Sequence, residues 1–184
     1  MAKEGSIPKK TETLTLRLDP KTKYAIELLA RSQKRTLAGA IEWAVERSLS
    51  SQMVDTVHGE QPLKTVVDET WYPDDLVGVA TLGAHAPHLL NHHESCLWAV
   101  IKNTPVLYTE LRDAQGKLIY MHQWAQGIII ARDLILEAGI VLSATGELEP
   151  IPAKKILELA GEDESFLTKI LEEARQAVVP HGTK

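Results

Sequence analysis

The chain has little of several features that define common classes of protein. It contains one cysteine, Cys96, so no internal disulfide can form, which is typical of the reducing cytosol and predicts a cytoplasmic location. No apolar run approaches the roughly 18 uncharged residues that a membrane span needs. No apolar segment follows the basic residues of the N-terminus, as a signal peptide would require. We therefore expect no membrane partner.

Signatures of catalysis are missing as well. The sequence has no glycine-rich phosphate-binding loop and no Gly-x-Ser-x-Gly motif, and its carboxylates are scattered. We expect neither an enzyme nor a bound cofactor. The composition, 44% hydrophobic and 24% charged, excludes a wholly disordered chain, and 184 residues allow one domain or a small module with a larger one.

Charge is divided unevenly along the chain. Residues 1–35 carry nine Lys and Arg against four acidic residues, a net +5, whereas residues 36–184 carry 11 against 21, a net −10. A basic head on an acidic body is typical of a protein that binds a polyanion, most simply nucleic acid. A solvated basic tail without a partner is the alternative that charge alone leaves open.

Residues 12–18 alternate strictly in polarity, which predicts a β-strand. The alternation puts apolar side chains on one face and polar ones on the other: Leu14, Leu16 and Leu18 against Thr13, Thr15 and Arg17. The leucine face must be buried, yet no neighbouring strand is available in the sequence. We therefore expect pairing with the same strand of a second copy, in an antiparallel two-stranded ribbon with the leucines as the dimer core. The polar face of this ribbon is narrow enough for a DNA major groove.

Two amphipathic helices are expected after the strand. Asp19 and Pro20 stop the strand and suit the cap and the first position of a helix. The polar segment Gln33-Lys34-Arg35 interrupts the helical pattern, and Thr36 can cap a second helix that runs to about residue 49.

These elements carry a family resemblance. Leu-Thr-Leu-Arg-Leu-Asp-Pro at 14–20, a helix with Leu28-Leu29-Ala30, a basic turn and Arg35-Thr36-Leu37 at the next helix resemble the ribbon-helix-helix DNA-binding fold of the MetJ/Arc/CopG superfamily. The resemblance covers about residues 11–50 and departs at Lys34, where many relatives have glycine. It implies a homodimer, or a dimer of dimers, that binds specific sites in double-stranded DNA and acts as a transcriptional regulator, a repressor.

The resemblance also implies roles for individual residues. Base edges would be contacted by Thr13, Thr15 and Arg17, because arginine can donate two hydrogen bonds to guanine and threonine can touch a thymine methyl. Phosphates would be contacted from the basic arm, the turn and the start of the second helix, by Lys9, Lys10, Lys34, Arg35, Thr36 and Leu37. The alternative for the ribbon residues is an exposed strand face without a ligand.

Proline, glycine and charge signals divide the remaining chain. We predict a flexible basic arm over 1–10, the head over 11–50, a linker over 51–70, an acidic, mostly helical C-terminal domain over 71–179 and a tail over 180–184. A helix is expected to start in the segment 71–75, with Asp74 and Asp75 in its first turn, and to end at Pro87. Further helices are expected from Asn91, with Glu94 in a capping box, over 128–142, with Gly139 near its end, and over 153–160 and 165–178. Residues 106–121 indicate a β-hairpin with Gly116 in the turn, with a helix as the alternative. The predicted fold class is mainly α.

The acidic domain offers candidate ligand groups. His85, His88, His92, His93 and Cys96 lie close together in the sequence, and His88, His92 and Cys96 have a spacing that can bind Zn²⁺, Ni²⁺ or Cu. Nickel-sensing ribbon-helix-helix repressors combine such a head with a His/Cys-containing body, but theirs has an alternating His-x-His pattern that this segment lacks. We expect structural roles for these residues and no metal.

An aromatic set in the same domain leaves two roles open. Its members are Trp71, Trp98, Tyr108, Tyr120 and Trp124. They could line a small-molecule effector pocket or a groove for a partner protein, or they could form the domain's core.

Two other functions fit the same head. One is an antitoxin whose C-terminal region binds a toxin, although antitoxins of this type usually have short, disordered tails. The other is an accessory protein for plasmid partition or for transfer of a mobile element. Both would use the same DNA-binding head, so the sequence does not separate the accessory role from regulation.

Overall fold

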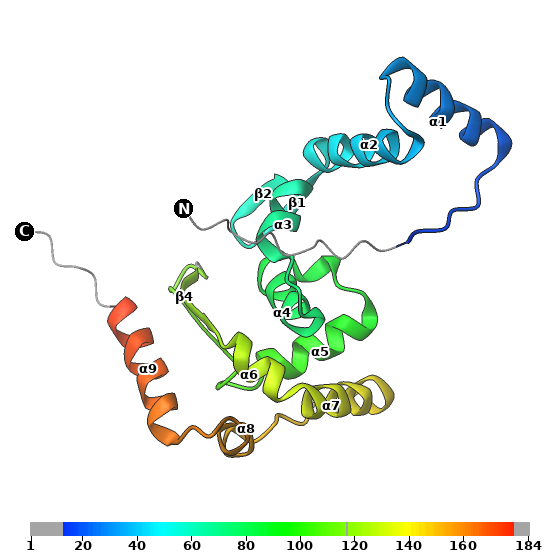
Figure 1. Cartoon of the computed structure of the whole chain (residues 1–184). Helices are drawn as coiled ribbons and strands as arrows, with labels where there is room; N and C mark the ends of the chain where they lie inside the picture. Colours follow the sequence, from blue (N-terminus) through cyan, green and yellow to red (C-terminus); the bar gives the residue numbers. More distant parts are fainter. Residues whose placement is uncertain (1–12, 117, 179–184) are drawn as a thin grey trace, which may run out of the picture. The chain divides into compact units, whose positions relative to one another are not determined.

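The computed structural model describes residues 13–116 and 118–178. Contacts divide the chain into two compact units, Met1–Ser48 and Leu49–Lys184. Helices dominate, and the described strands form two antiparallel sheets of two strands each (Figure 1). This confirms the mainly α fold class. Within the described ranges, no helix is both long enough and apolar enough to cross a bilayer.

The first unit contains α1 (Pro20–Ser32) and most of α2 (Leu37–Ser51). Asp19 caps α1 as predicted, because its Oδ1 accepts hydrogen bonds from the amides of Lys21 and Thr22, each at 3.0 Å. Residues 13–19 form neither helix nor strand within the single chain. The ribbon predicted here needs a strand from a second copy and stays a prediction.

Residues 51–70, expected as a linker, hold regular structure instead. A hairpin of β1 (Met53–Thr56) and β2 (Gly59–Pro62) leads into α3 (Leu63–Thr70), in which Val66 is fully buried. Gly59 has a φ of 102°, a backbone conformation that the tight turn requires and that other residues rarely adopt. The strands have four residues each with little apolar alternation, which left no strand signal in the sequence.

The remaining helices of the second unit agree largely with the sequence. They are α4 (Asp75–His85), the 3₁₀ turn η1 (Pro87–Leu89), α5 (His92–Lys102), α6 (Ala125–Ile130), α7 (Arg132–Thr145), α8 (Ala153–Ala160) and α9 (Glu164–Val178). Asp74 caps α4, and Asn91 with Glu94 forms the predicted capping box on α5. Helix α5 packs against α4 and α7, and α9 packs against the hairpin strand β4 (Leu118–Gln123).

The predicted helix over 128–142 is two helices. α6 and α7 meet at buried Ala131, and α7 continues to Thr145, where Gly146 ends it with a φ of 75°. Gly139 therefore lies within α7 and not near its end, and an added Cβ there would come within 2.6 Å of Leu97 Cδ2. The break follows from packing, because α6 contacts α8 and α4 whereas α7 contacts α5.

The second unit contains an apolar core. Its fully buried side chains come from α4, α5, the segment that follows α5, and α6 to α8, and include Leu76, Ile101, Leu107, Ile128, Ile135 and Ile156. Burial of such side chains is the main favourable term in folding.

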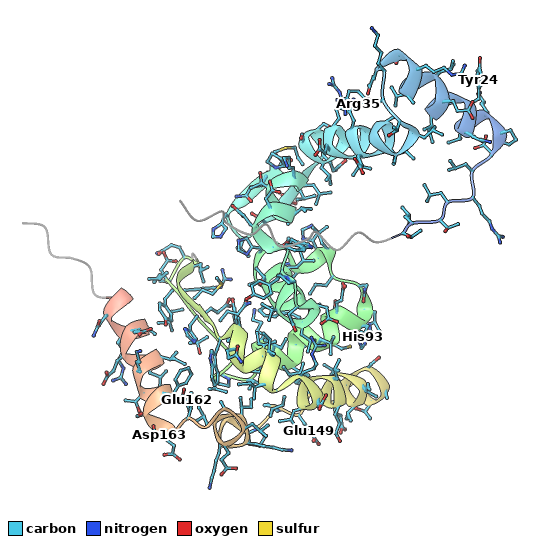
Figure 2. The ribbon with its side chains drawn as sticks, viewed as in Figure 1. Tyr24, Arg35, His93, Glu149, Glu162 and Asp163 are labelled. Carbon is cyan, nitrogen blue, oxygen red and sulfur yellow. The ribbon has the colours of Figure 1, made fainter. Side chains whose placement is uncertain are left out.

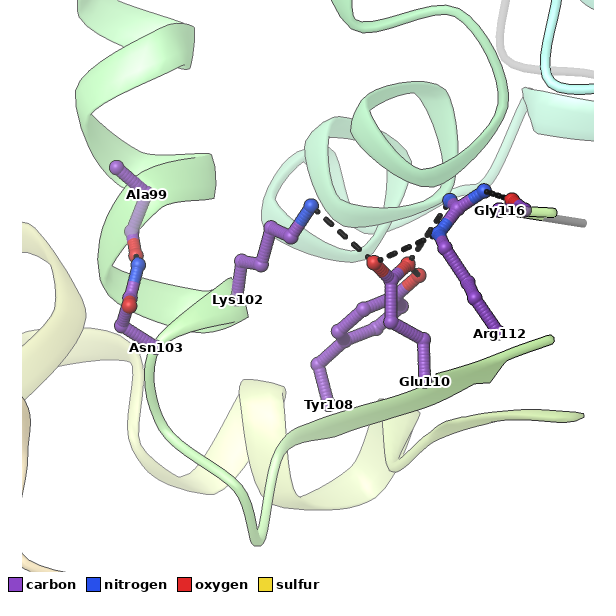
Figure 3. A network of polar contacts seen from close by, with 7 residues as sticks. All are labelled: Ala99, Lys102, Asn103, Tyr108, Glu110, Arg112 and Gly116. Atoms are coloured by element: carbon purple, nitrogen blue, oxygen red, sulfur yellow. Dashed lines mark hydrogen bonds and ion pairs between the residues drawn. The ribbon is translucent and has the colours of Figure 1, made fainter. Parts of the chain in front are cut away.

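The second hairpin has the two predicted strands, with Gly116 in the turn between them. A polar network holds its first strand against α5. In β3 (Tyr108–Arg112), Glu110 accepts a hydrogen bond from the Tyr108 hydroxyl at 2.8 Å and from Arg112 Nε at 3.2 Å (Figure 3). Lys102 Nζ of α5 lies 3.4 Å from the same carboxylate. Burial alone would raise the pKa of Glu110, but the hydrogen bonds from Arg112 and Tyr108 and the charge of Lys102 outweigh it and lower that pKa.

Candidate nucleic-acid interface

The first unit has a large open apolar hollow beside residues 14–18. Its volume is about 630 Å³, and it is lined by Leu14, Leu16, Arg17, Leu18, Lys23, Ile26, Leu37 and Ile41. The leucines at 14, 16 and 18 are 79%, 49% and 43% exposed. Tyr24 and Leu28 of α1 are 57% and 44% exposed. Because a single chain leaves this surface uncovered, it is a candidate interface with another copy.

The turn between α1 and α2 has a defined hydrogen-bond pattern. The amide of Lys34 donates to Arg31 O at 3.2 Å, and the amide of Arg35 donates to Ala30 O at 2.9 Å. These two bonds form a Schellman motif, in which the residue after the helix cap takes a left-handed conformation. That residue is Lys34, with a φ of 53°. The glycine that many ribbon-helix-helix proteins carry here would suit the backbone better.

The start of α2 places the amides of its first turn beside basic side chains. Thr36 caps the helix as predicted, because its Oγ1 accepts from the Gly39 amide at 3.1 Å and its carbonyl accepts from Ala40 at 2.9 Å. The amides of Leu37 and Ala38 belong to the first turn, where the helix itself supplies no acceptor. Such amides and the positive end of the helix dipole favour an anion.

The structure brings the predicted phosphate-contacting residues of the turn together. Lys34, Arg35, Thr36 and Leu37 follow one another through the corner between α1 and α2, and all four are exposed. Figure 2 labels Arg35 at this corner. The predicted base-contacting residues, Thr13, Thr15 and Arg17, are exposed as well. Lys9 and Lys10, the arm over 1–10 and the tail over 180–184 lie outside the described residues.

The histidine and cysteine cluster is spread over separate environments. His88 is exposed in η1, His93 is exposed in the first turn of α5 (Figure 2), and Cys96 is buried. His92 Nε2 lies 3.4 Å from Ser143 Oγ of α7. Among the described residues, no three His, Cys, Asp or Glu side chains are placed to share a metal ion.

His85 contacts residues outside the group of His88, His92, His93 and Cys96 with which the sequence placed it. Its Nε2 lies 3.6 Å from Glu69 Oε2, and its ring meets that of His58 edge-on at 5.4 Å. Sequence reasoning missed these partners because they lie in the segment expected to be a linker.

The aromatic set divides between core and surface. Trp98 and Tyr108 are buried and meet edge-on at 4.8 Å, and Trp124 packs on Phe166 at 4.4 Å. Tyr120 is half-buried. Trp71, by contrast, is 73% exposed.

Comparison with protein-family models, with curated proteins and with solved structures found no match for this chain.

Proposed function

We propose that the chain is a homodimeric, site-specific double-stranded DNA-binding protein that acts as a transcriptional regulator, a repressor. In this proposal residues 12–18 of two copies pair as a β-ribbon, and the ribbon enters the major groove of the operator.

The uncovered leucine face supports this proposal most directly. Leu14, Leu16 and Leu18 line an apolar hollow with residues from both α1 and α2, so a second copy would bury apolar surface on all three elements at once. Burial of apolar area at about 25 cal/mol per Å² makes such a surface costly to leave in water. Dimerisation would also supply a strand partner for residues 12–18.

The polar residues of the same segment supply the proposed base contacts. Arg17 can donate two hydrogen bonds to guanine O6 and N7, and Thr13 and Thr15 can hydrogen-bond to bases or pack on a thymine methyl. Lys34, Arg35 and the amides of Leu37 and Ala38 would hold a flanking phosphate and fix the register on the duplex.

The folded second unit weighs against the antitoxin alternative. Helices and two hairpins occupy most of residues 49–178, with one apolar core, which differs from the short disordered tail typical of such antitoxins. A partition or transfer accessory protein would use the same head, and the pattern of binding sites separates the two roles.

Footprinting of the full-length protein on genomic fragments, beginning with the DNA upstream of its own gene, tests the proposal. Protected sites at promoters support regulation, whereas clustered direct repeats support the accessory role. At a protected site, Arg17→Ala should weaken binding by about 1–3 kcal/mol and relax base preference, because a bidentate base contact is lost.

Arg175→Ala is the matched control, because this arginine is exposed on α9 in the other unit. It should leave affinity and base preference unchanged. Equal losses in Arg17→Ala and Arg175→Ala would contradict readout by the ribbon, and absence of any protected site would contradict the proposal itself.

A further inference from the structure

The second unit carries a small open groove beside Trp71, which we call the Trp71 groove. Its volume is about 260 Å³, and it is lined by residues from the end of α3, from one face of α4 and from the first turn of α5. Helix α4 contributes Gly78, Val79 and Leu82, which recur at helical spacing on that face. All of these elements belong to the second unit, so the groove lies within that unit alone.

Trp71 is held in place although its side chain is exposed. Its amide donates to Val67 O at 3.0 Å and caps the C-terminus of α3, which fixes the backbone that carries the indole. The side chain is nevertheless 73% exposed, and Tyr72 and Val67 beside it are 44% and 40% exposed. Tryptophan and tyrosine on a rigid backbone are the residues that most often dominate binding energy at protein interfaces.

The charged groups of the groove have one sign. Asp75 and Glu94 line it, and among the described residues no Lys, Arg or His side chain does. Arg132 Nη2 lies 2.6 Å from Asp75 Oδ1, yet the Asp75 side chain remains 82% exposed. Glu94 Oε2 accepts from the Asn91 amide at 2.9 Å. A partner with positive charge therefore meets complementary charge here, on a unit whose residues 49–184 carry 10 basic against 19 acidic side chains.

The size of the groove limits what can fill it. Pockets for small-molecule ligands usually measure about 300–1,000 Å³ and enclose most of the ligand, so this open groove of about 260 Å³ is better matched to one or two anchoring side chains.

We propose that the Trp71 groove binds a basic segment of a partner protein, which inserts an apolar side chain between Trp71 and the half-buried groove face of α4. Lysine or arginine residues flanking that anchor lie beside Asp75 and Glu94. The proposal goes beyond DNA binding by the head and does not depend on it.

Calorimetric titration of the full chain with synthetic peptides tests the proposal. The probes are two 12-residue peptides with the same leucines, one with lysine and arginine at all other positions and one with glutamate and aspartate there. The basic peptide should bind at least tenfold more tightly than the acidic one, and its affinity should fall with added salt.

Two variants test the groove itself. Trp71→Ala removes the exposed indole. Gly78→Met fills the groove from α4, where an added Cβ has no contact nearer than Tyr72 O at 4.0 Å. Each should lower affinity for the basic peptide at least tenfold. Leu159→Ala, at an apolar residue of α8 that is 57% exposed, is the control and should leave affinity unchanged.

Glu94→Gln tests the charge without loss of the helix cap. Glutamine can still accept from the Asn91 amide in the capping box, so α5 should remain intact while one negative charge is removed. The variant should weaken binding of the basic peptide and reduce its salt dependence. Unchanged unfolding midpoints confirm that each variant is folded.

Three results would overturn the proposal. The first is equal binding of the two peptides, or no binding of the basic one. The second is full affinity in both Trp71→Ala and Gly78→Met, which would place any binding elsewhere on the acidic surface. The third is a smaller assembly in sedimentation of Trp71→Ala, which would show that a second copy of the chain occupies the groove.

Discussion

Single residues in this protein are constrained by close approach between helices, and Gly83 of α4 is the clearest case. An added Cβ at Gly83 would lie 2.5 Å from Trp98 Cδ2, and the indole is itself buried. Gly78 in the same helix has no such neighbour, since its nearest contact would be at 4.0 Å.

Gly83→Ala should lower the free energy of unfolding by about 1–3 kcal/mol, because Trp98 or the helix must shift in a packed core. Gly78→Ala should leave it unchanged or raise it by up to about 1 kcal/mol, through better helix propensity alone. Urea unfolding at neutral pH measures both. A Gly83→Ala protein as stable as Gly78→Ala would contradict the packing of α4 on α5.

Lys34 combines an unfavourable backbone conformation with a useful charge. Its φ of 53° costs roughly 1–2 kcal/mol for a residue with a Cβ. Lys34→Gly should therefore raise the thermal unfolding midpoint, while Lys34→Ala should not. Both should weaken DNA binding by the same factor on cognate and unrelated sequences, because a phosphate contact carries no base preference.

Fluorescence anisotropy with labelled duplexes, together with thermal unfolding, checks this pair. If Lys34→Gly bound DNA as tightly as the natural protein, the proposed role of the turn in phosphate contact would be excluded. If it were destabilised, the left-handed turn would not exist in solution.

At the scale of elements, the sequence predicts where a helix starts when a nearby side chain accepts the hydrogen bonds of its first amides. Asp19, Asp74 and the Asn91–Glu94 box cap helices through side chains only a few residues away, so the sequence predicts these helix starts. Gly116, with a φ of 83°, likewise marks the turn of the second hairpin.

Elements that depend on distant contacts could not be predicted in the same way. The run Ile128 to Arg132 has no helix-breaking residue, yet it contains the break at Ala131 because α6 and α7 pack on different helices. The groove at Trp71 could not be predicted either, since sequence spacing does not distinguish a buried indole from an exposed one.

Glu110 should make the free energy of unfolding depend on pH. Its pKa is lower in the folded protein than the ordinary value, so its contribution is present above that ordinary value and is lost as the pH falls through the folded pKa. Glu110→Gln removes this contribution. The free energy of unfolding should then fall less steeply between about pH 5 and pH 3 than in the natural protein.

Urea midpoints at several pH values measure the slope. Glu137→Gln, at an exposed carboxylate of α7, serves as the control and should keep the natural slope. Other carboxylates with lowered pKa, such as Asp75 and Asp163, contribute equally to both proteins. Identical slopes in Glu110→Gln and the natural protein would exclude a stabilising role for the network in Figure 3.

At the scale of the whole molecule, the exposed leucines predict an assembly that the single chain does not contain. Leu16 and Thr15 are neighbours that the ribbon would place on opposite faces, one in the dimer core and one toward DNA.

Leu16→Asp should abolish the dimer in sedimentation equilibrium, because two carboxylates would be buried near the two-fold axis without partners. Thr15→Asp should remain dimeric and fail only in DNA binding, because its charge is repelled by phosphates. The two variants add the same charge one position apart, so they separate the face that assembles the protein from the face that reads DNA. A dimeric Leu16→Asp protein, or a monomeric natural protein at micromolar concentration, would exclude the ribbon.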